Sequence, residues 1–184
     1  MAEKPASSAR GSATRAKLVN AFVSLALSRG FDKVSMDDVA AAAGVSRSTA
    51  YTHFRGTVPL LNATLSRPCT ALAASVRLKP VPELVFLLQH FQEQWHRNPM
   101  FFREPIRSLF SQCLARTIAT ALRLDPDRNR HRPAMPRGML PAVLAELQLG
   151  IVERWLEGET TTHPEVIAAA LTASAHRLVF GERT

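Results

Sequence analysis

The residue types with the clearest chemical pattern are hydroxyl, aromatic and cationic side chains gathered between positions 46 and 53. An arginine such as Arg47 can bind the O6 and N7 atoms of guanine through two hydrogen bonds. Hydroxyl groups and histidines bind phosphate oxygens, and a threonine methyl can contact the methyl of thymine. This segment therefore suits contact with a nucleic acid, if one structural element presents its side chains together.

Other reactive residue types are present without the spacing that catalysis or metal binding needs. His90 and His96 are six positions apart, whereas two metal ligands on one helical face are four apart. Cys69 and Cys113 share no metal-like spacing and are too few for a disulfide framework. Nothing resembles a nucleophile elbow or a pair of catalytic carboxylates. The sequence predicts no enzyme, no metal site and no cofactor.

The composition favours a basic protein made of packed helices. The 184 residues carry a net charge of +8, and 46% of them are hydrophobic, which is enough for a sizeable core. Aromatic residues make up only 7%, while alanine and leucine dominate, and their side chains lose little freedom in a helix. A basic chain binds polyanions, either nucleic acid or an acidic membrane surface.

The N-terminal region lacks the apolar segment of a signal peptide, because residues 1–17 are rich in alanine, serine, lysine and arginine. No apolar run approaches the roughly 20 residues that span a bilayer. We therefore expect a cytoplasmic protein. Residues 1–12 are small, polar and basic, and we expect them to form a disordered arm.

Hydrophobic residues recur at helical spacing through most of the rest of the chain. The proline-rich, charged segment 123–137 interrupts this pattern and is expected to be a loop. We find no internal repeat and no convincing strand. The predicted helices cover residues 14–29, 35–42, 46–53, 58–77, 84–95, 99–103, 106–121, 139–157 and 164–179.

Two short helices with a tight turn between them predict a helix-turn-helix. Ser35 and Asp38 have the spacing of a capping box at the start of the first helix. Gly44 tolerates the positive φ that the turn needs, and Ser46 can cap the second helix. In such a motif the second helix enters the major groove with its N-terminal residues facing the base edges.

The stretch from Thr14 to Leu61 resembles the DNA-binding head of the TetR (tetracycline-repressor-like) regulators. Those heads have a glycine and an aromatic residue after the first helix, here Gly30-Phe31. Their short second helix ends in Ala-x-x-Ala-Gly-Val-Ser, which residues 40–46 reproduce. Their recognition helix ends in Tyr-x-His-Phe, as residues 51–54 do here.

The resemblance implies roles for individual residues of the head. Arg47 and Ser48 are the expected base readers, and Thr52 is expected to contact a thymine methyl. Ser35 and Met36 begin a helix whose N-terminal amides can hold a phosphate. Ala50 and Phe54 are expected to face inward. The full set of expected DNA-binding residues is Ser35, Met36, Ser46, Arg47, Ser48, Thr49, Tyr51, Thr52, His53, Arg55 and Thr57.

One position departs from the family pattern. Family members have a lysine followed by an acidic residue at the start of the fourth helix, where the lysine meets a phosphate. This chain has Thr57-Val58 there. One phosphate contact is therefore expected to be weaker, or to be made by Arg55 instead.

For the rest of the chain, the resemblance implies a helical body that encloses a ligand cavity and forms a dimer. Such cavities are mostly apolar with a few polar groups. The two C-terminal helices of each of two chains would form a four-helix interface, for which alanine-rich faces are suitable. The expected ligand-binding residues are Phe91, Trp95, Phe110, Cys113, Leu114, Leu147, Gln148 and Ile151.

These observations predict an all-α protein with a helix-turn-helix DNA-binding domain at residues 1–57, including a flexible basic arm, and a ligand-sensing, dimerising domain at 58–184. The expected function is repression from a palindromic operator bound by a homodimer, with a small-molecule effector. An activator or architectural factor without a ligand is one alternative. A helical enzyme or binding protein with an incidental helical corner is another. A membrane-surface protein is disfavoured, because the apolar faces suit a core.

Overall fold

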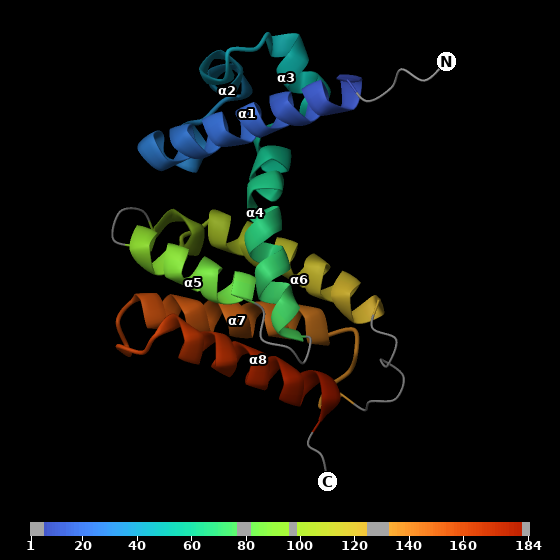
Figure 1. Cartoon of the computed structure of the whole chain (residues 1–184), viewed down its shortest axis with the longest axis vertical. Coiled ribbons are helices and arrows are strands. Elements are labelled where there is room, and N and C mark those ends of the chain that lie inside the picture. Colours follow the sequence, from blue (N-terminus) through green and yellow to red (C-terminus); the bar gives the residue numbers. More distant parts are fainter. Residues whose placement is uncertain (1–5, 77–81, 96–98, 125–132, 182–184) are drawn as a thin grey trace. The chain divides into compact units, whose positions relative to one another are not determined.

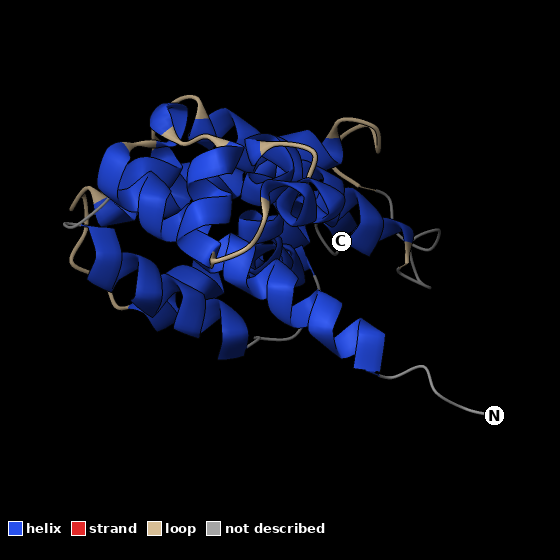
Figure 2. Cartoon of the chain, turned by 90° about the horizontal axis from the view of Figure 1, so that it is seen from above, coloured by secondary structure: helices blue, strands red, loops and turns tan. Residues whose placement is uncertain are grey.

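All the regular secondary structure in the described part of the chain is helical. The computed structural model describes residues 6–76, 82–95, 99–124 and 133–181, and it shows no strand among them (Figure 2). The predicted all-α class is therefore confirmed. The helices are α1 (Ala6–Arg29), α2 (Met36–Ala43), α3 (Arg47–His53), α4 (Thr57–Ala73), α5 (Pro82–Trp95), α6 (Ile106–Arg123), α7 (Leu140–Leu156) and α8 (Pro164–Phe180), with short 3-10 helices η1 (Phe31–Lys33), η2 (Ala74–Val76) and η3 (Pro99–Phe102).

The chain divides into two compact units, one ending at Leu65 and the other beginning at Ser66. The division lies inside α4, so this helix belongs partly to each unit. The predicted boundary after residue 57 separates the DNA-binding part from the ligand-sensing part. It is a statement about function, and it stays a prediction.

The first unit is built on a long N-terminal helix whose buried face supports α2 and α3. Leu18, Phe22 and Ala26 recur at helical spacing on α1 and are all buried. Phe22 also meets Phe31 edge to face, with ring centroids 6.0 Å apart, an arrangement that aromatic quadrupoles favour. This packing fixes the segment that leads into the helix-turn-helix.

The expectation of a disordered arm over residues 1–12 is wrong for residues 6–12, which are helical. The helix α1 begins at Ala6 rather than near Thr14. Extending an existing helix is favourable even without an apolar stripe, because only nucleation is costly. The remaining residues of the predicted arm, 1–5, lie outside the described residues.

The second unit contains four long helices that pack on one another (Figure 1). In that view α5 and α6 form one layer and α7 and α8 another, and α6 contacts α7, α7 contacts α8, and α5 contacts α8. Each helix contributes a buried apolar stripe. Fully or almost fully buried members of this core are Leu84, Leu88, Phe110, Leu114, Ile118, Leu144, Leu149, Val152, Leu171 and Ala175.

Two boundaries differ from the predicted ones. α4 ends at Ala73 and is followed by the 3-10 helix η2, whereas the periodicity predicted one helix up to position 77, which lies outside the described residues. The predicted loop 123–137 begins one residue later, because α6 continues to Arg123; residues 133–137 are non-helical, and residues 125–132 are not described.

Pro68 lies inside α4. Proline has no backbone N–H, so the usual bond from position 68 to the carbonyl of Thr64 cannot form. The hydroxyl of Thr64 donates to the carbonyl of Leu60 at 3.1 Å, one turn earlier, and does not replace the missing bond. The backbone ladder of α4 is thus interrupted close to the division between the two units.

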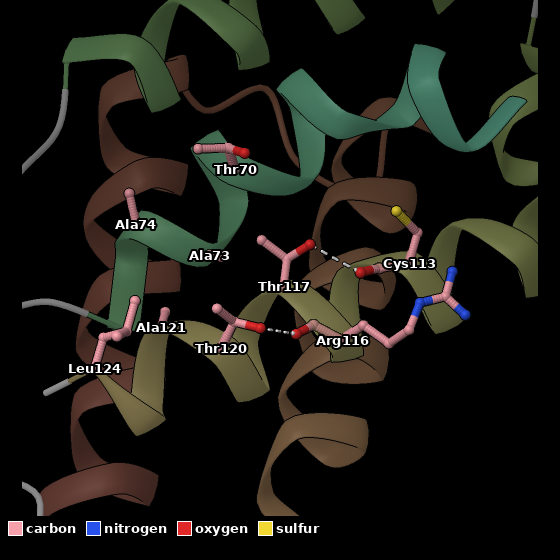
Figure 3. Close-up of a pocket in the computed structure, with 9 residues that line it drawn as sticks. All are labelled: Thr70, Ala73, Ala74, Cys113, Arg116, Thr117, Thr120, Ala121 and Leu124. Carbon is pink, nitrogen blue, oxygen red and sulfur yellow. Dashed lines mark hydrogen bonds between the residues drawn. The ribbon is translucent and has the colours of Figure 1, made fainter. Parts of the chain in front are cut away.

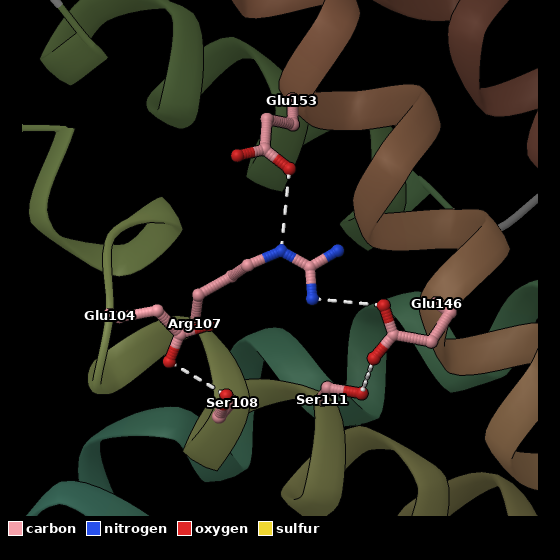
Figure 4. A network of polar contacts seen from close by, with 6 residues as sticks. All are labelled: Glu104, Arg107, Ser108, Ser111, Glu146 and Glu153. Carbon is pink, nitrogen blue, oxygen red and sulfur yellow. Dashed lines mark hydrogen bonds and ion pairs between the residues drawn. The ribbon is translucent and has the colours of Figure 1, made fainter.

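A polar network joins α6 to α7 (Figure 4). Arg107 of α6 is largely buried. It binds Glu146 at 2.9 Å and Glu153 at 3.4 Å, and these two glutamates lie about two turns apart on α7. The Ser111 hydroxyl donates to the other carboxylate oxygen of Glu146. These hydrogen bonds from Ser111 and Arg107 hold the pKa of Glu146 below its usual range.

The stabilising effect of Glu146 is expected to depend on pH. A carboxyl with a lowered pKa stabilises the folded state above its unfolded pKa of about 4.3, and the contribution is lost as the pH falls through the folded value. Because Glu146 is half exposed, Glu146→Gln is expected to reduce the free energy of unfolding by at most about 1 kcal/mol at neutral pH.

Urea denaturation of both proteins at several pH values measures this effect. The two curves should converge in acid, where the carboxyl is protonated in the wild type too. Glu93→Gln, at an exposed position of α5, is the control and should show no such convergence. A difference at Glu146 that is the same at all pH values would contradict the electrostatic account.

Candidate nucleic-acid interface

The turn between α2 and α3 has the geometry that the sequence predicts. Gly44 adopts a left-handed conformation, with φ of 67°. The amide of Val45 donates to the carbonyl of Ala40 at 3.0 Å, and the amide of Gly44 donates to that of Ala41 at 3.1 Å. These two bonds form a Schellman motif, which satisfies the last carbonyls of α2. A side chain at position 44 would be strained in this conformation.

The start of α2 carries the predicted capping box. The amide of Asp38 donates to the Ser35 hydroxyl at 3.2 Å, and the amide of Ser35 donates to the Asp38 carboxylate at 3.0 Å. The bonds from the Ser35 hydroxyl and amide lower the pKa of Asp38. The box fixes where α2 begins, and it also places a carboxylate at the end of the helix where a phosphate was expected.

Met36 is placed differently from the other expected DNA-binding residues. Its side chain is 5% exposed and belongs to the core of the first unit. Only its backbone amide, in the first turn of α2, is available to a phosphate. The interior needs an apolar group at this position, and the exposed surface begins at its neighbours Ser35 and Asp37.

The helix α3 begins at a second cap. The Ser46 hydroxyl accepts a bond from the amide of Thr49 at 3.1 Å, and it lies 2.8 Å from the Thr49 hydroxyl and 3.0 Å from that of Ser48. A short helix of seven residues depends strongly on such a cap, because the first amides of a helix have no partner within it. The cap thus orders the hydroxyl groups at the start of α3.

The two faces of α3 differ as expected. Ala50 and Phe54 are buried and hold α3 against the rest of the first unit. Ser48 and Thr52 are exposed on the opposite face, and the Thr52 hydroxyl donates to the carbonyl of Ser48 at 2.9 Å. Since the hydroxyl hydrogen is used within the helix, the methyl group and the hydroxyl oxygen of Thr52 remain available for contact.

Arg47 is exposed, with 70% of its side chain accessible, and it is held from two sides. Its Nε atom lies 3.1 Å from a carboxylate oxygen of Asp37 on α2. Its guanidinium lies 5.6 Å from the centre of the Tyr51 ring, one turn along α3. An ion pair this exposed contributes at most about 1 kcal/mol, so a stronger partner can displace it. Sequence reasoning missed Asp37, because the angle between α2 and α3 determines the contact.

A second arginine contacts the end of α3. The guanidinium of Arg15, on α1, lies 4.3 Å from the centre of the Phe54 ring, within the range of a cation–π interaction. His53 is half-buried, and Arg55 is exposed just beyond α3. Thr57 is half-buried and begins α4. The corner α2–turn–α3 therefore brings together the expected residues from Ser46 to Arg55, with Ser35 at the start of α2.

The eight expected ligand-binding residues come from α5, α6 and α7. Cys113 lines a pocket of about 490 Å³ whose walls come from α4, η2 and α6. Phe91 and Phe110 are buried in the core, with ring centroids 6.4 Å apart, and Leu114 is buried beside them on α6. Trp95, Leu147 and Ile151 are half-buried.

Gln148 differs from a purely structural core residue. It is 1% exposed, and its amide nitrogen donates to the hydroxyl of Ser75 at 2.8 Å. The Ser75 hydroxyl gives its own hydrogen to the carbonyl of Leu72. If the amide of Gln148 were flipped, its oxygen would face this hydroxyl, which has no hydrogen left to donate. The oxygen has no hydrogen-bond partner, which is costly for a buried polar atom.

The described residues contain no group of three or more histidine, cysteine or carboxylate side chains that could hold a metal ion. His96, of the histidine pair considered above, lies outside the described residues. Within the same described segments, no helix is long and apolar enough to cross a membrane.

The part of the chain that matches a known protein family includes this helix-turn-helix corner. Residues 18–64 match the family model described as bacterial regulatory proteins, tetR family. The match begins in α1 and ends in α4, so it includes the whole of α2, the turn and α3. A comparison with curated proteins finds no match.

Solved structures resemble the chain over nearly its whole length. FadR of Thermus thermophilus, a TetR-family repressor crystallised with lauroyl-CoA, is 22% identical, with a TM-score of 0.50 over 92% of this chain and 95% of that one. A TetR regulator of Streptococcus agalactiae is 20% identical, with a TM-score of 0.53 over 92% and 97%. FadR of Bacillus halodurans, a fatty acid degradation regulator, is 13% identical, with a TM-score of 0.51 over 100% and 99%. These likenesses show a shared fold.

Proposed function

Because residues 18–64 match the tetR family of bacterial regulatory proteins, we propose that the chain is a DNA-binding transcriptional regulator of this family that represses transcription by occupying a palindromic operator as a homodimer. The observation that carries the proposal is the capped corner α2–turn–α3, whose outward face holds Arg47, Ser48 and Thr52. Two such helices about one turn of DNA apart read the two halves of a palindrome.

The proposed contacts follow from the chemical group that each side chain can present to DNA. Arg47 and Ser48 read base edges, and the methyl of Thr52 contacts a thymine methyl. Phosphates are bound by hydroxyl, imidazole and guanidinium groups around them and by the first amides of α2. The residues proposed for the phosphate contacts are Ser35, Met36 through its amide, Ser46, Thr49, Tyr51, His53, Arg55 and Thr57.

We assign the dimer interface to α7 and α8. Support comes from Val166 of α8, a large apolar side chain that remains 55% exposed in the single chain. The exposed alanines at 169, 170 and 173 let another helix approach closely. A dimer is also what a palindromic operator requires. The protein acts where the DNA is, in the cytoplasm.

The effector is proposed to be a small molecule that binds in the second unit. The unpaired amide oxygen of Gln148 supports this, because a donor from a ligand would satisfy it. The Thermus FadR, which shares the fold, was crystallised with lauroyl-CoA. The proposed ligand-contacting residues are Gln148 as the polar group, with Phe91, Trp95, Phe110, Cys113, Leu114, Leu147 and Ile151 around it. A ligand regulates only if it binds more tightly to the conformation that does not fit the operator.

The test is footprinting of the purified protein on DNA upstream of its own gene and of the divergent neighbour, at a series of salt concentrations, together with transcription in vitro from the protected promoter. A protected palindrome, a steep fall of log K with log salt and reduced transcription are expected. Binding no tighter than to random DNA would contradict the proposed operator. Increased transcription would contradict repression.

Thr57→Lys is expected to strengthen DNA binding. The change restores a cation at the start of α4, where this chain departs from the pattern of similar heads. Position 57 is half-buried, and a lysine there can extend its charged end along the surface into solvent. One additional phosphate contact should steepen the slope of log K against log salt by about 0.9.

Gln92→Lys, at an exposed position of α5, adds the same charge outside the first unit and is the control. An equal gain of affinity in both variants would mean that net charge alone is responsible. No gain in Thr57→Lys would show that another group, such as Arg55, already binds that phosphate.

A further inference from the structure

The two cysteines of the chain meet, although 43 residues lie between them in the sequence. Cys69 lies on α4 and Cys113 on α6, and the two side chains are within hydrogen-bonding contact. Cys69 is fully buried, whereas Cys113 retains 9% of its accessible surface. Both carry free thiols. Both thiols are thus buried, and Cys113 is the less buried of the two.

The Cys113 thiol lies at the wall of the 490 Å³ pocket (Figure 3). The floor of the pocket is α6 and one side is the end of α4, and the Cys113 sulfur points from α6 toward α4. Ala73, Ala74, Ala121 and Leu124 give the pocket an apolar lining. The hydroxyls of Thr117 and Thr120 donate to carbonyls of α6 at 2.9 and 3.0 Å, which leaves their oxygens as acceptors.

The charges around the dithiol favour a thiolate on Cys113. The Cys69 thiol donates a hydrogen bond to the Cys113 sulfur, and the guanidinium of Arg116 lies within reach of the same sulfur one turn along α6. Both lower the pKa of Cys113, in that order of importance. The pKa of Cys69 is raised, because it gives its hydrogen to Cys113 and is buried. Cys113 is thus the nucleophile of the pair, and Cys69 stays protonated beside it.

We propose that Cys113 and Cys69 form an oxidation site for small organic hydroperoxides, with Cys113 as the peroxide-reacting thiolate and Cys69 as the resolving thiol. The apolar lining accommodates the alkyl group of such a molecule. Arg116 is a positioning residue that stabilises the thiolate and the alkoxide leaving group.

The reaction balances in two steps. The Cys113 thiolate attacks the outer oxygen of the hydroperoxide, the O–O bond breaks, and Cys113 sulfenic acid forms while an alcohol leaves after protonation. The Cys69 sulfur then attacks the Cys113 sulfur, an S–S bond forms, and the hydroxyl group leaves as water with the Cys69 proton. Two thiols are oxidised by two electrons, and one hydroperoxide is reduced to alcohol and water. Thiol–disulfide exchange with an external thiol reverses the modification.

The experiment treats the full-length reduced protein with cumene hydroperoxide or hydrogen peroxide and counts free thiols over time. Peptide mapping without reductant identifies the product. We expect loss of both thiols together and a single intramolecular 69–113 disulfide that dithiothreitol removes. The ratio of the rate with cumene hydroperoxide to the rate with hydrogen peroxide should be higher for the folded protein than for the same chain unfolded in urea, where the pocket is absent.

Variants separate the two roles. In Cys69→Ser the reaction should stop at a Cys113 sulfenic acid that dimedone traps, whereas in Cys113→Ser the Cys69 thiol should persist. Arg116→Gln, at an exposed position, should slow the reaction at neutral pH and shift its pH midpoint upward. Circular dichroism checks that each variant is folded.

Persistence of both thiols in the native protein would overturn the proposal. So would oxidation of Cys113 in the wild type to sulfinic acid without a disulfide, or a rate equal to that of the unfolded chain. Disulfides only between chains would also overturn it. These readouts need no DNA, so they are independent of whether the proposed repressor function holds.

Discussion

An Arg47→Ala variant is expected to bind the operator about 5- to 150-fold less tightly, because a bidentate arginine–guanine contact discriminates by about 1–3 kcal/mol. The loss should be concentrated at one base position of each half-site, so substitution of that base pair should weaken the wild type but leave the variant almost unaffected. Titration of the wild type and the variant against both DNA sequences measures this interaction directly.

The body of the chain supplies a closely matched control. Arg154 is also 70% exposed, and it forms an ion pair with Glu159 at 3.0 Å, much like that of Arg47 with Asp37. Arg154→Ala should therefore leave operator binding and its base preference unchanged. If Arg47→Ala weakened binding equally on all sequences, Arg47 would contact phosphates rather than bases.

A Phe110→Ala variant is expected to lose about 3–5 kcal/mol of unfolding free energy in the second unit. Phe110 is fully buried on α6 and meets Phe91 and Phe102 at ring-centroid distances of 6.4 and 6.2 Å. Removing the ring leaves a cavity beside side chains that α5 and η3 hold in place. The magnitude would make this variant among the least stable single substitutions of the chain.

Tryptophan fluorescence during urea denaturation measures the effect, because both tryptophans, Trp95 and Trp155, belong to the second unit. Phe86→Ala is the control. Its ring lies on α5 and is 71% exposed, so its loss should change stability by less than about 0.5 kcal/mol. A small effect at Phe110 would instead indicate that the ring borders a space which a ligand normally fills.

Most of the fold could be predicted from the sequence, because short-range signals fix helix ends. Gly44 and the serine caps at 35 and 46 mark the corner, and the structure confirms each of them. The inward positions of Ala50 and Phe54 are confirmed too, since helical spacing determines which face is buried. The helical start of the chain at Ala6 escaped prediction, because a helix can be extended into a polar segment that has no apolar periodicity.

Contacts between helices could not be predicted. The pairing of Arg47 with Asp37, and of Cys69 with Cys113, depends on crossing angles and on the rotation of each helix about its axis. No spacing rule connects residues on different helices. The burial of Met36 is similar, because the capping box specifies where α2 begins but not which of its first residues faces inward.

The proline in α4 has a mechanical consequence. A helix resists bending because consecutive turns are tied by hydrogen bonds, and the tie to Thr64 that position 68 would normally make is absent. The bending stiffness of α4 is therefore lowest between residues 64 and 68, the stretch that contains the division between the two units. A sideways displacement of the part of α4 beyond Pro68 is therefore expected to bend the helix at this point rather than to move it as a rigid unit. Pro68→Ala is expected to restore the missing bond and to make α4 stiffer there.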